Sequence, residues 1–215
     1  DATGYNISYL TGTLTIDAAS LTITARDTSR VYGTTLTGES GSTRFTSSGL
    51  QNSETIGSIT LSYASNGNTA TNAVGVYSSA VAASLATGGT FTASNYTISY
   101  VAGNITVATA PLTITGLAAN NKVYDGTTAA TLSGTPTYSG LVNGQNFSVI
   151  GIPTATFASA NVGTGIAVTV TGYLAPNSNY SITQPVLSAN ITSASSSITA
   201  TGTTTYTYNA TPQGP

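Results

Sequence analysis

The chain has 215 residues, of which only four are basic and six acidic, 5% in all, whereas charged residues make up about 25% of an average soluble domain. Four basic residues cannot form the positive stripe that binds nucleic acid phosphates, so nucleic acid is excluded as a partner. His and Cys are absent, which excludes Ser-His-Asp and Cys-His catalytic groups, disulfides and ligands for softer metals. No apolar run approaches the roughly 18–20 residues of a membrane span, so we expect no membrane insertion.

Residues 1–19 open the chain with two short segments in which apolar and polar side chains alternate, Tyr5-Asn-Ile-Ser-Tyr9 and Gly12-Thr-Leu-Thr-Ile16. Alternation with a period of two residues predicts β-strands that bury one face. The same pair of segments recurs further along the chain, where it ends a longer repeat. We therefore interpret residues 1–19 as the C-terminal strands of a preceding module.

Residues 20–109 are predicted to form a complete module, which we call the first copy. It begins with Leu21-Thr-Ile-Thr-Ala25 and Arg30-Val-Tyr-Gly33, and it ends with Tyr96-Thr-Ile-Ser-Tyr100 and Gly103-Asn-Ile-Thr-Val107. Thr suits the solvent face of such strands because its branched Cβ fits the pleat. Gly and Asn recur at intervals of about 8–12 residues, which is typical of a sandwich or barrel.

Residues 110–194, the second copy, repeat the same segments in the same order. Leu112-Thr-Ile-Thr-Gly116 and Lys122-Val-Tyr-Asp-Gly126 open this copy, and Tyr180-Ser-Ile-Thr183 and Asn190-Ile-Thr192 close it. A repeat of this length is a whole domain, larger than a solenoid unit or a propeller blade.

Residues 195–215 begin the pattern once more, with Ser197-Ile-Thr-Ala200 and Tyr206-Thr-Tyr-Asn209. We interpret them as the start of a following module. The chain is thus expected to hold two complete modules between two partial ones.

These patterns predict an all-β fold of tandem small β modules. An Ig-like sandwich is the preferred architecture, and a β-grasp-like module is the alternative. The connection Ala108-Thr-Ala-Pro111 is short, so we expect adjacent modules to be arranged end to end. A single turn of helix is compatible with Leu50–Glu54 and with Leu141–Gln145.

The motifs of both copies resemble two known families. The second copy is similar to the YDG module and the first copy to the MBG module, and both occur in tandem in large secreted adhesins, notably haemagglutinin-like exoproteins exported by two-partner secretion. The resemblance implies a surface adhesin stalk of a Gram-negative type of bacterium and carries no catalytic residues. The motifs are Lys122-Val-Tyr-Asp-Gly-Thr-Thr128, Gly140-Leu141, Val162-Gly163 and Asn179-Tyr180 for YDG, and Arg30-Val-Tyr-Gly33 and Asn95–Val107 for MBG.

Two short motifs at equivalent places, Tyr32-Gly33 and Tyr124-Asp125-Gly126, are interpreted as structural turns. Asp-Gly favours a positive φ, and we expect Tyr124 to pack over the end of its module. The alternative is a ligand site, because an exposed Tyr can stack on a sugar.

Tyrosines also recur on the predicted strands, at Tyr5, Tyr96 and Tyr180 and at Tyr9 and Tyr100. Residues i and i+4 of a strand face the same side. We expect these rings to pack in the core or at module joints, and a carbohydrate-binding patch is the alternative.

The acidic residues do not suggest catalysis or metal binding. A glycosidase needs two carboxylates about 5–10 Å apart, and an Asp-x-Asp pattern for calcium is missing. We therefore expect no enzyme, no metal and no cofactor. Lys122 is the one lysine; it is the only residue that could form an isopeptide crosslink, and a surface lysine is the preferred interpretation. The carboxylates are Asp1, Asp17, Asp27, Glu39, Glu54 and Asp125.

N-glycosylation is a further hypothesis, although a chain rich in Thr and Ser forms Asn-x-Ser/Thr triplets by chance. The seven candidate residues are Asn6, Asn95, Asn104, Asn146, Asn179, Asn190 and Asn209.

The preferred function is a structural stalk or spacer repeat of a secreted or surface-anchored bacterial adhesin, which projects a distal adhesive region. The alternative is a repeat that itself binds glycan or matrix, or that pairs with itself in a biofilm through exposed sheet edges. The expected partners are the neighbouring modules of the same chain and a host or biofilm glycan or protein. The expected location is extracellular, at the bacterial cell surface.

Overall fold

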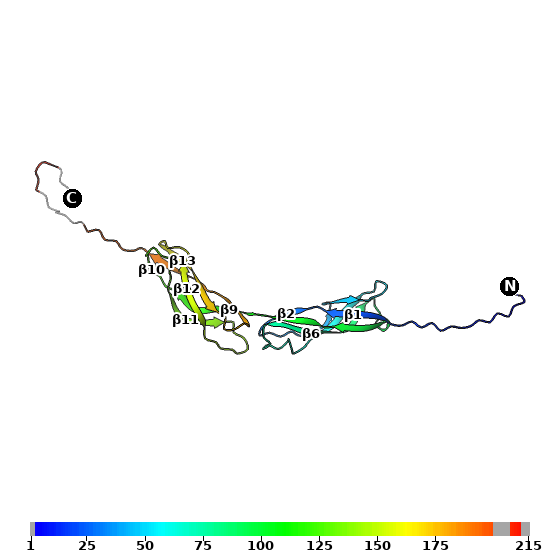
Figure 1. Ribbon diagram of the computed structural model, residues 1–215. Helices are drawn as coiled ribbons and strands as arrows, with labels where there is room; N and C mark the ends of the chain where they lie inside the picture. The colour runs from blue at the N-terminus through cyan, green and yellow to red at the C-terminus, as the bar shows by residue number, and fades with distance from the viewer. Residues whose placement is uncertain (1–2, 200–206, 212–215) are drawn as a thin grey trace. The chain divides into compact units, whose positions relative to one another are not determined.

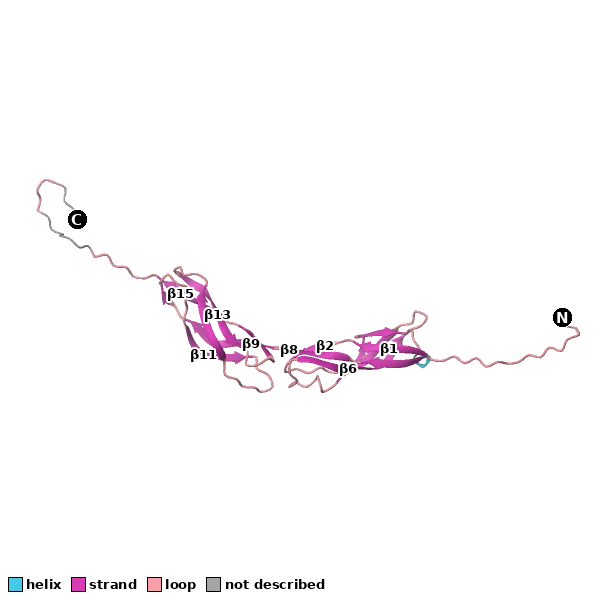
Figure 2. Ribbon diagram, viewed as in Figure 1, coloured by secondary structure: helices cyan, strands magenta, loops and turns pink. Residues whose placement is uncertain are grey.

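The computed structural model describes residues 3–199 and 207–211, and its regular structure there is almost entirely strand (Figures 1 and 2). The predicted all-β class is confirmed. The one helix in these ranges is the three-residue 3-10 turn η1 (Ala93–Asn95), whereas a β-grasp module would lay a helix across its sheet. The strands are β1 (Ala19–Ala25), β2 (Thr28–Val31), β3 (Glu39–Ser42), β4 (Phe45–Ser48), β5 (Ile56–Tyr63), β6 (Gly75–Gly89), β7 (Tyr96–Val101), β8 (Gly103–Ala108), β9 (Ala110–Ala119), β10 (Lys122–Val123), β11 (Leu132–Ser139), β12 (Ile150–Phe157), β13 (Gly163–Leu174), β14 (Tyr180–Thr183) and β15 (Val186–Thr192).

The described residues fall into two compact units. Unit 1 takes them from Asp1–Leu112, Tyr138–Ser148 and Ala175–Ile182, and unit 2 from Thr113–Thr137, Val149–Leu174 and Thr183–Pro215. Unit 1 therefore holds the first copy together with three segments of the second, residues 110–112, 138–148 and 175–182. No helix in the described part of the chain is long and apolar enough to cross a membrane.

The first copy forms two sheets, with strand orders β4-β1-β7 and β2-β8-β6-β5-β3. β1 pairs parallel with β7, and β2 pairs parallel with β8, so the chain passes from one sheet to the other after β1 and again after β7. The two passages approach closely: a Cβ on Gly103 would lie 2.7 Å from the carbonyl oxygen of Ala25. A glycine is required there because any side chain would overlap the neighbouring backbone.

One core fills the space between these two sheets. Leu21 and Ile23 of β1 pack with Ile59 and Leu61 of β5 and with Ile105 of β8, and all five are buried. The threonines between the buried residues of β1 point away from the core, as the period of two predicts. The first copy is thus a two-sheet sandwich stabilised by apolar burial.

The second copy repeats this topology, with strand orders β11-β9-β14 and β10-β15-β13-β12. β10 pairs parallel with β15 as β2 does with β8. Where β3 lines the edge of the first copy, the second has only an isolated bridge between Ala129 and Thr156. The core of unit 2 is smaller and centres on Phe157, Val168 and Ile191.

The segments outside the two copies form no strands where they are described. Residues 3–18, predicted as strands of a preceding module, are extended and expose Tyr5, Tyr9 and Ile16. Residues 195–199 and 207–211 are likewise without strand, and residues 1–2, 200–206 and 212–215 lie outside the described part.

Candidate functional site: the tyrosine-glycine turn

The turn that follows β2 begins with Tyr32, whose N–H donates to the carbonyl of Ala108 at the end of β8 (2.8 Å). Gly33 comes next with φ +90°, a backbone conformation that is strained for any residue with a Cβ atom. Thr34 N–H then closes the turn on the carbonyl of Val31 (3.1 Å). The ring of Tyr32 is only 3% exposed, because part of the second copy covers it within unit 1.

Tyr180 of β14 provides the ring contact to Tyr32. The two centroids are 5.5 Å apart and the planes meet at 82°, the edge-to-face arrangement that aromatic pairs prefer. Gln145 joins the hydroxyls: its Nε2 donates to Tyr32 OH (3.1 Å), and its Oε1 accepts from Tyr180 OH (2.5 Å). The hydroxyl of Tyr180 also accepts from the N–H of Val142 (3.2 Å).

Gly33 lies directly against Val142. A Cβ at Gly33 would stand 2.5 Å from Cγ2 of Val142, closer than any real contact. The carbonyl of Ala70 adds two hydrogen bonds, one from Gly33 N–H (3.1 Å) and one from Asn143 Nδ2 (3.0 Å). The turn of the first copy is therefore seated in a socket of the second, made of Val142, Gln145 and Tyr180.

Arg30 fixes the loop that carries Ala70. Its side chain is buried, 5% exposed, and among the described residues no carboxylate pairs with it. All five guanidinium N–H groups are directed instead at oxygen acceptors, and burial lowers the pKa of Arg30. The acceptors are the carbonyls of Gly67 (2.8 Å), Val31 (3.4 Å), Thr34 (2.7 Å) and Thr69 (2.7 Å) and Oδ1 of Asn72 (3.2 Å).

Lys122 occupies the equivalent position of the second copy. Its Nζ contacts Oδ1 of Asp125 (2.7 Å) and donates to the carbonyls of Thr127 (2.8 Å) and Ala129 (3.1 Å). The Phe157 ring centroid lies 5.7 Å away. The Lys122 side chain is 17% exposed and thus partly buried. This differs from the surface position that we expected. Both copies thus use a cation to hold the segment beside the turn.

The turn of the second copy is itself well formed. Tyr124 N–H donates to the carbonyl of Thr192 at the end of β15 (2.8 Å), as Tyr32 does to Ala108. Asp125 accepts from the N–H and the hydroxyl of Thr127, both at 2.9 Å, which is an Asx-turn. These bonds, and first the one from Lys122, lower the pKa of Asp125 to about 2.

The two turns differ in what covers them. Tyr124 is 45% exposed, which differs from the packing over the module end that we expected. Gly126, with φ +77°, would meet nothing within 4 Å if it carried a Cβ, in contrast to Gly33. The second turn is therefore an uncovered counterpart of the first.

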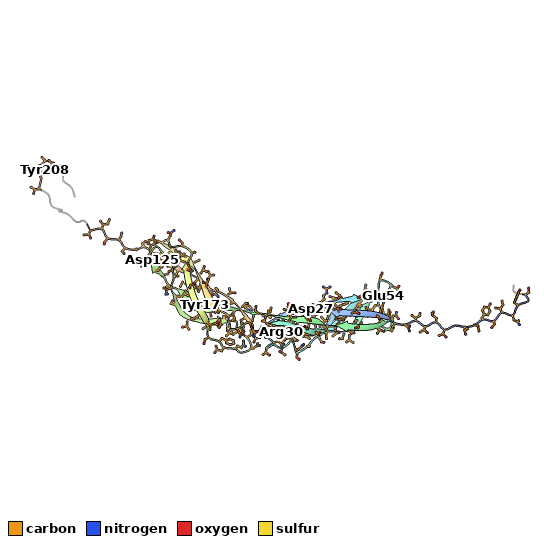
Figure 3. The ribbon with its side chains drawn as sticks, in the orientation of Figure 1. Asp27, Arg30, Glu54, Asp125, Tyr173 and Tyr208 are labelled. Carbon is orange, nitrogen blue, oxygen red and sulfur yellow. The ribbon has the colours of Figure 1, made fainter. Side chains whose placement is uncertain are left out.

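The other end of the first copy carries a second tyrosine group. Tyr96 OH donates to the carboxylate of Glu54 and accepts from the N–H of Gln51 (2.9 Å), and the bond to Glu54 raises the pKa of Tyr96. Arg30 and Glu54 lie toward opposite ends of this copy (Figure 3). A hollow of about 400 Å³ adjoins Tyr96 and is lined also by Asp17 and Asn95.

The recurrent tyrosines divide into buried and exposed ones. Core packing is confirmed for Tyr96 and Tyr180, whereas Tyr100 is half-exposed and its hydroxyl accepts from the N–H of Ala86 (2.9 Å). Tyr5 and Tyr9 are exposed on the extended N-terminal segment.

The side chains of three candidate glycosylation residues accept hydrogen bonds from distant parts of the chain. Oδ1 of Asn104 accepts from Ser79 N–H (3.2 Å) and Oδ1 of Asn190 from Gly165 N–H (2.8 Å), which tie β8 and β15 to the neighbouring strand. Oδ1 of Asn179 accepts from Val74 N–H (2.9 Å). The remaining candidates have exposed side chains: Asn6, Asn95, Asn146 and Asn209.

Asp17 and Glu54 both line the hollow beside Tyr96, whereas Asp27 and Glu39 bond within the strands around them. Asp27 accepts from Asn104 N–H (2.7 Å), and Glu39 accepts from the hydroxyl of Ser42 (3.1 Å). Glu54 accepts from Tyr96 OH, and Asp125 accepts from Thr127 and pairs with Lys122 in the turn after Tyr124. Asp1 lies outside the described residues. Among the described residues, no three side chains of the types Asp, Glu, His and Cys gather where they could hold a metal ion.

Sequence reasoning singled out the turn residues and the packing of Tyr180, but it missed the role of Arg30 and the socket residues Val142 and Gln145. A signal for the cation existed, because a basic residue precedes Val-Tyr in both copies, at Arg30 and Lys122. The socket residues gave none, because Val142 and Gln145 are ordinary loop residues whose role depends on contacts with a distant segment.

Comparison with known families agrees with this duplicated structure. The model of the MBG domain of the YGX type matches residues 21–106, and that of the YDG domain matches residues 108–189. Neither a curated protein nor a solved structure shows significant similarity to the chain. The Tyr-Gly and Tyr-Asp-Gly turns lie in the first and second matched regions respectively. The first copy therefore matches an MBG domain and the second copy a YDG domain, one of each in tandem.

Proposed function

We propose that the chain is a structural spacer, a stalk segment of a secreted or surface-anchored bacterial adhesin. The observation that carries this proposal is the seating of the MBG turn in the YDG socket. Tyr32 is buried against Tyr180, and Gly33 against Val142, within one compact unit. In a tandem whose modules share such a contact, each module fixes the position of the next one, which is what a spacer must do.

The chemistry of the chain supports a passive role without catalysis. MBG and YDG domains are not enzymatic families. Asp27, Glu39 and Asp125 are engaged in turns and at strand ends, where each accepts hydrogen bonds from neighbouring backbone or hydroxyl groups. Few charges and many hydroxyl side chains suit a surface that separates two functional parts.

In this role the chain lies outside the cell, and its partners are the neighbouring modules. A distal adhesive region, rather than this segment, contacts host or biofilm material. A second candidate, direct glycan binding by a repeat, is favoured by one observation, the exposed ring of Tyr124. A glycan array probed with the native chain and with Tyr124→Ala tests it: binding that the substitution abolishes supports this candidate, and no binding dismisses it.

Small-angle scattering on chains of different length tests the spacer. A longer chain can be made by joining residues 1–194 directly to a second segment, residues 20–215. The repeat continues without a break across this junction, because Ala194 and Ala19 occupy equivalent positions at the end of a module. A spacer nearly doubles its radius of gyration on this extension. A compact assembly would grow only about 1.3-fold, as folded globules do with chain length, and that result would contradict the proposal.

A further inference from the structure

The socket of the second copy has a counterpart in the first. Gln51 N–H donates to Tyr96 OH (2.9 Å) as Val142 N–H does to Tyr180 OH (3.2 Å). The hydroxyl of Tyr96 then donates to Glu54, as that of Tyr180 does to Gln145. The two tyrosines open equivalent strands, β7 and β14.

These two sockets differ in occupancy. Tyr32 covers the Tyr180 socket, where Gln145 donates to its hydroxyl. Over the Tyr96 socket the described residues leave the hollow of about 400 Å³. At the Tyr180 socket, the amide of Gln145 donates to the entering tyrosine hydroxyl; at the Tyr96 socket, the carboxylate of Glu54 would accept from it instead. A tyrosine hydroxyl can both donate and accept. A carboxylate acceptor would strengthen that bond.

The turns show the same complementarity from the other side. Tyr32 and Tyr124 each follow a short strand, β2 or β10, that pairs parallel with the last strand of the copy, β8 or β15. The N–H of each tyrosine donates at 2.8 Å to the carbonyl of the last residue of β8 or β15. Tyr32 is 3% exposed and Tyr124 is 45% exposed. Asp125 adds no net charge to the uncovered turn, because Lys122 pairs with it.

We propose that the tyrosine turn and the tyrosine socket form a head-to-tail joint that modules of this kind share. The Tyr96 socket, with Glu54 and Gln51, receives the tyrosine-glycine turn of another such module. The Tyr124 turn enters the socket of another. The occupant is a module of the same kind because the occupied socket holds that turn. This joint rests on the proposed spacer function and gives it a mechanism: each module orients the next through one turn.

Thiol labelling of the extended chain tests the joint, because the native sequence has no cysteine. In residues 1–194 followed by residues 20–215, the Tyr124 turn of the first half meets the Tyr96 socket of the second half. Asn95→Cys places a single thiol at the socket, and Asn95 is exposed in the native chain. The same substitution in the first half, whose socket has no preceding turn, is the matched control.

We expect the thiol in the second half to react at least about ten-fold more slowly than the control, since a tyrosine and its turn cover it. Tyr124→Ala in the first half should restore the fast rate, and it should leave the fold intact because that ring is exposed. Equal rates in the two halves, or a slow rate that Tyr124→Ala leaves unchanged, would overturn the joint. An extended scattering profile with equal rates would refute the joint and leave the spacer standing, whereas a compact profile would refute the spacer itself.

Discussion

At the scale of single residues, two cations hold the segments beside the two turns. Arg30 is buried with carbonyl oxygens as partners, and these dipoles replace the water that a guanidinium would otherwise need. Lys122 does the same for its turn with fewer donors and a carboxylate. A guanidinium has five donors in a fixed plane, and Arg30 directs each of them at its own oxygen, whereas an ammonium has only three donors.

Arg30→Lys is expected to destabilise the first copy by about 2–4 kcal/mol, because three ammonium donors cannot reach five buried acceptors. Urea unfolding followed by circular dichroism measures the loss. Arg26, whose Nε makes one exposed bond to Phe45, is the matched control, and Arg26→Lys should change stability by less than about 0.5 kcal/mol. Equal effects of the two substitutions would show that the bonds of Arg30 are not needed.

Gly33→Ala and Gly126→Ala separate the effect of backbone strain from that of contact. Both residues have positive φ, so each substitution should lower the free energy of unfolding by about 1 kcal/mol. Only the alanine at position 33 would also overlap Val142, which should add about 1–3 kcal/mol. The free energy of unfolding of both variants measures this, and an equal loss would mean that Gly33 is not seated against Val142.

The pH dependence of the second turn follows from Asp125. Its pKa in the folded chain, about 2, lies below the roughly 3.9 of an unfolded aspartate, so the unfolded state binds the proton more tightly. The stabilisation is complete above about pH 5 and is lost as the pH falls from about 4 to about 2. Carbon-13 NMR of the Asp125 carboxyl reports the pKa. Asp125→Asn should remove this part of the pH dependence of unfolding, and a normal pKa would contradict the Lys122 pair.

At the scale of strands, the sequence pattern predicted the regular segments and missed the irregular ones. Leu21, Ile23 and Ala25 are buried, as their alternation with threonine predicts. A helical turn at Leu50–Glu54 is wrong, because Asn52 and Ser53 adopt positive φ (51° and 59°). Side-chain periodicity reports which face of a strand is buried, whereas a left-handed backbone is imposed by surrounding loops that leave no periodic signal.

The unit 2 core is tested on strand β12. Phe157→Ala should destabilise unit 2 by about 3–5 kcal/mol, because the ring is fully buried among Val168, Ala189 and Ile191. Hydrogen exchange should accelerate in β12, β13 and β15 and remain slow in β1, β5 and β8, whose core is separate. Ile152→Ala on the same strand, where the side chain is 87% exposed, should have little effect. Acceleration throughout both cores would contradict their separation.

At the scale of the whole molecule, the duplication could be predicted and the joint could not. Repeated motifs revealed two copies, and the structure gives both copies the same strand order apart from the edge strand β3, which the second copy lacks. The turn residues Tyr32, Gly33, Tyr124, Asp125 and Gly126 were recognised because they recur. That Tyr32 packs on Tyr180 was not evident, because this contact joins segments of different copies and depends on the folded loops between them.

The seating of the first turn in the second copy is the claim on which the rest depends, and one NMR measurement tests it directly. In chains with labelled tyrosine rings, nuclear Overhauser effects should connect the ring protons of Tyr32 and Tyr180, whose centroids lie 5.5 Å apart. Assignment by Tyr32→Phe and Tyr180→Phe identifies the pair. Cross-peaks between these two rings are the predicted result, and their absence from an otherwise folded chain would contradict the account.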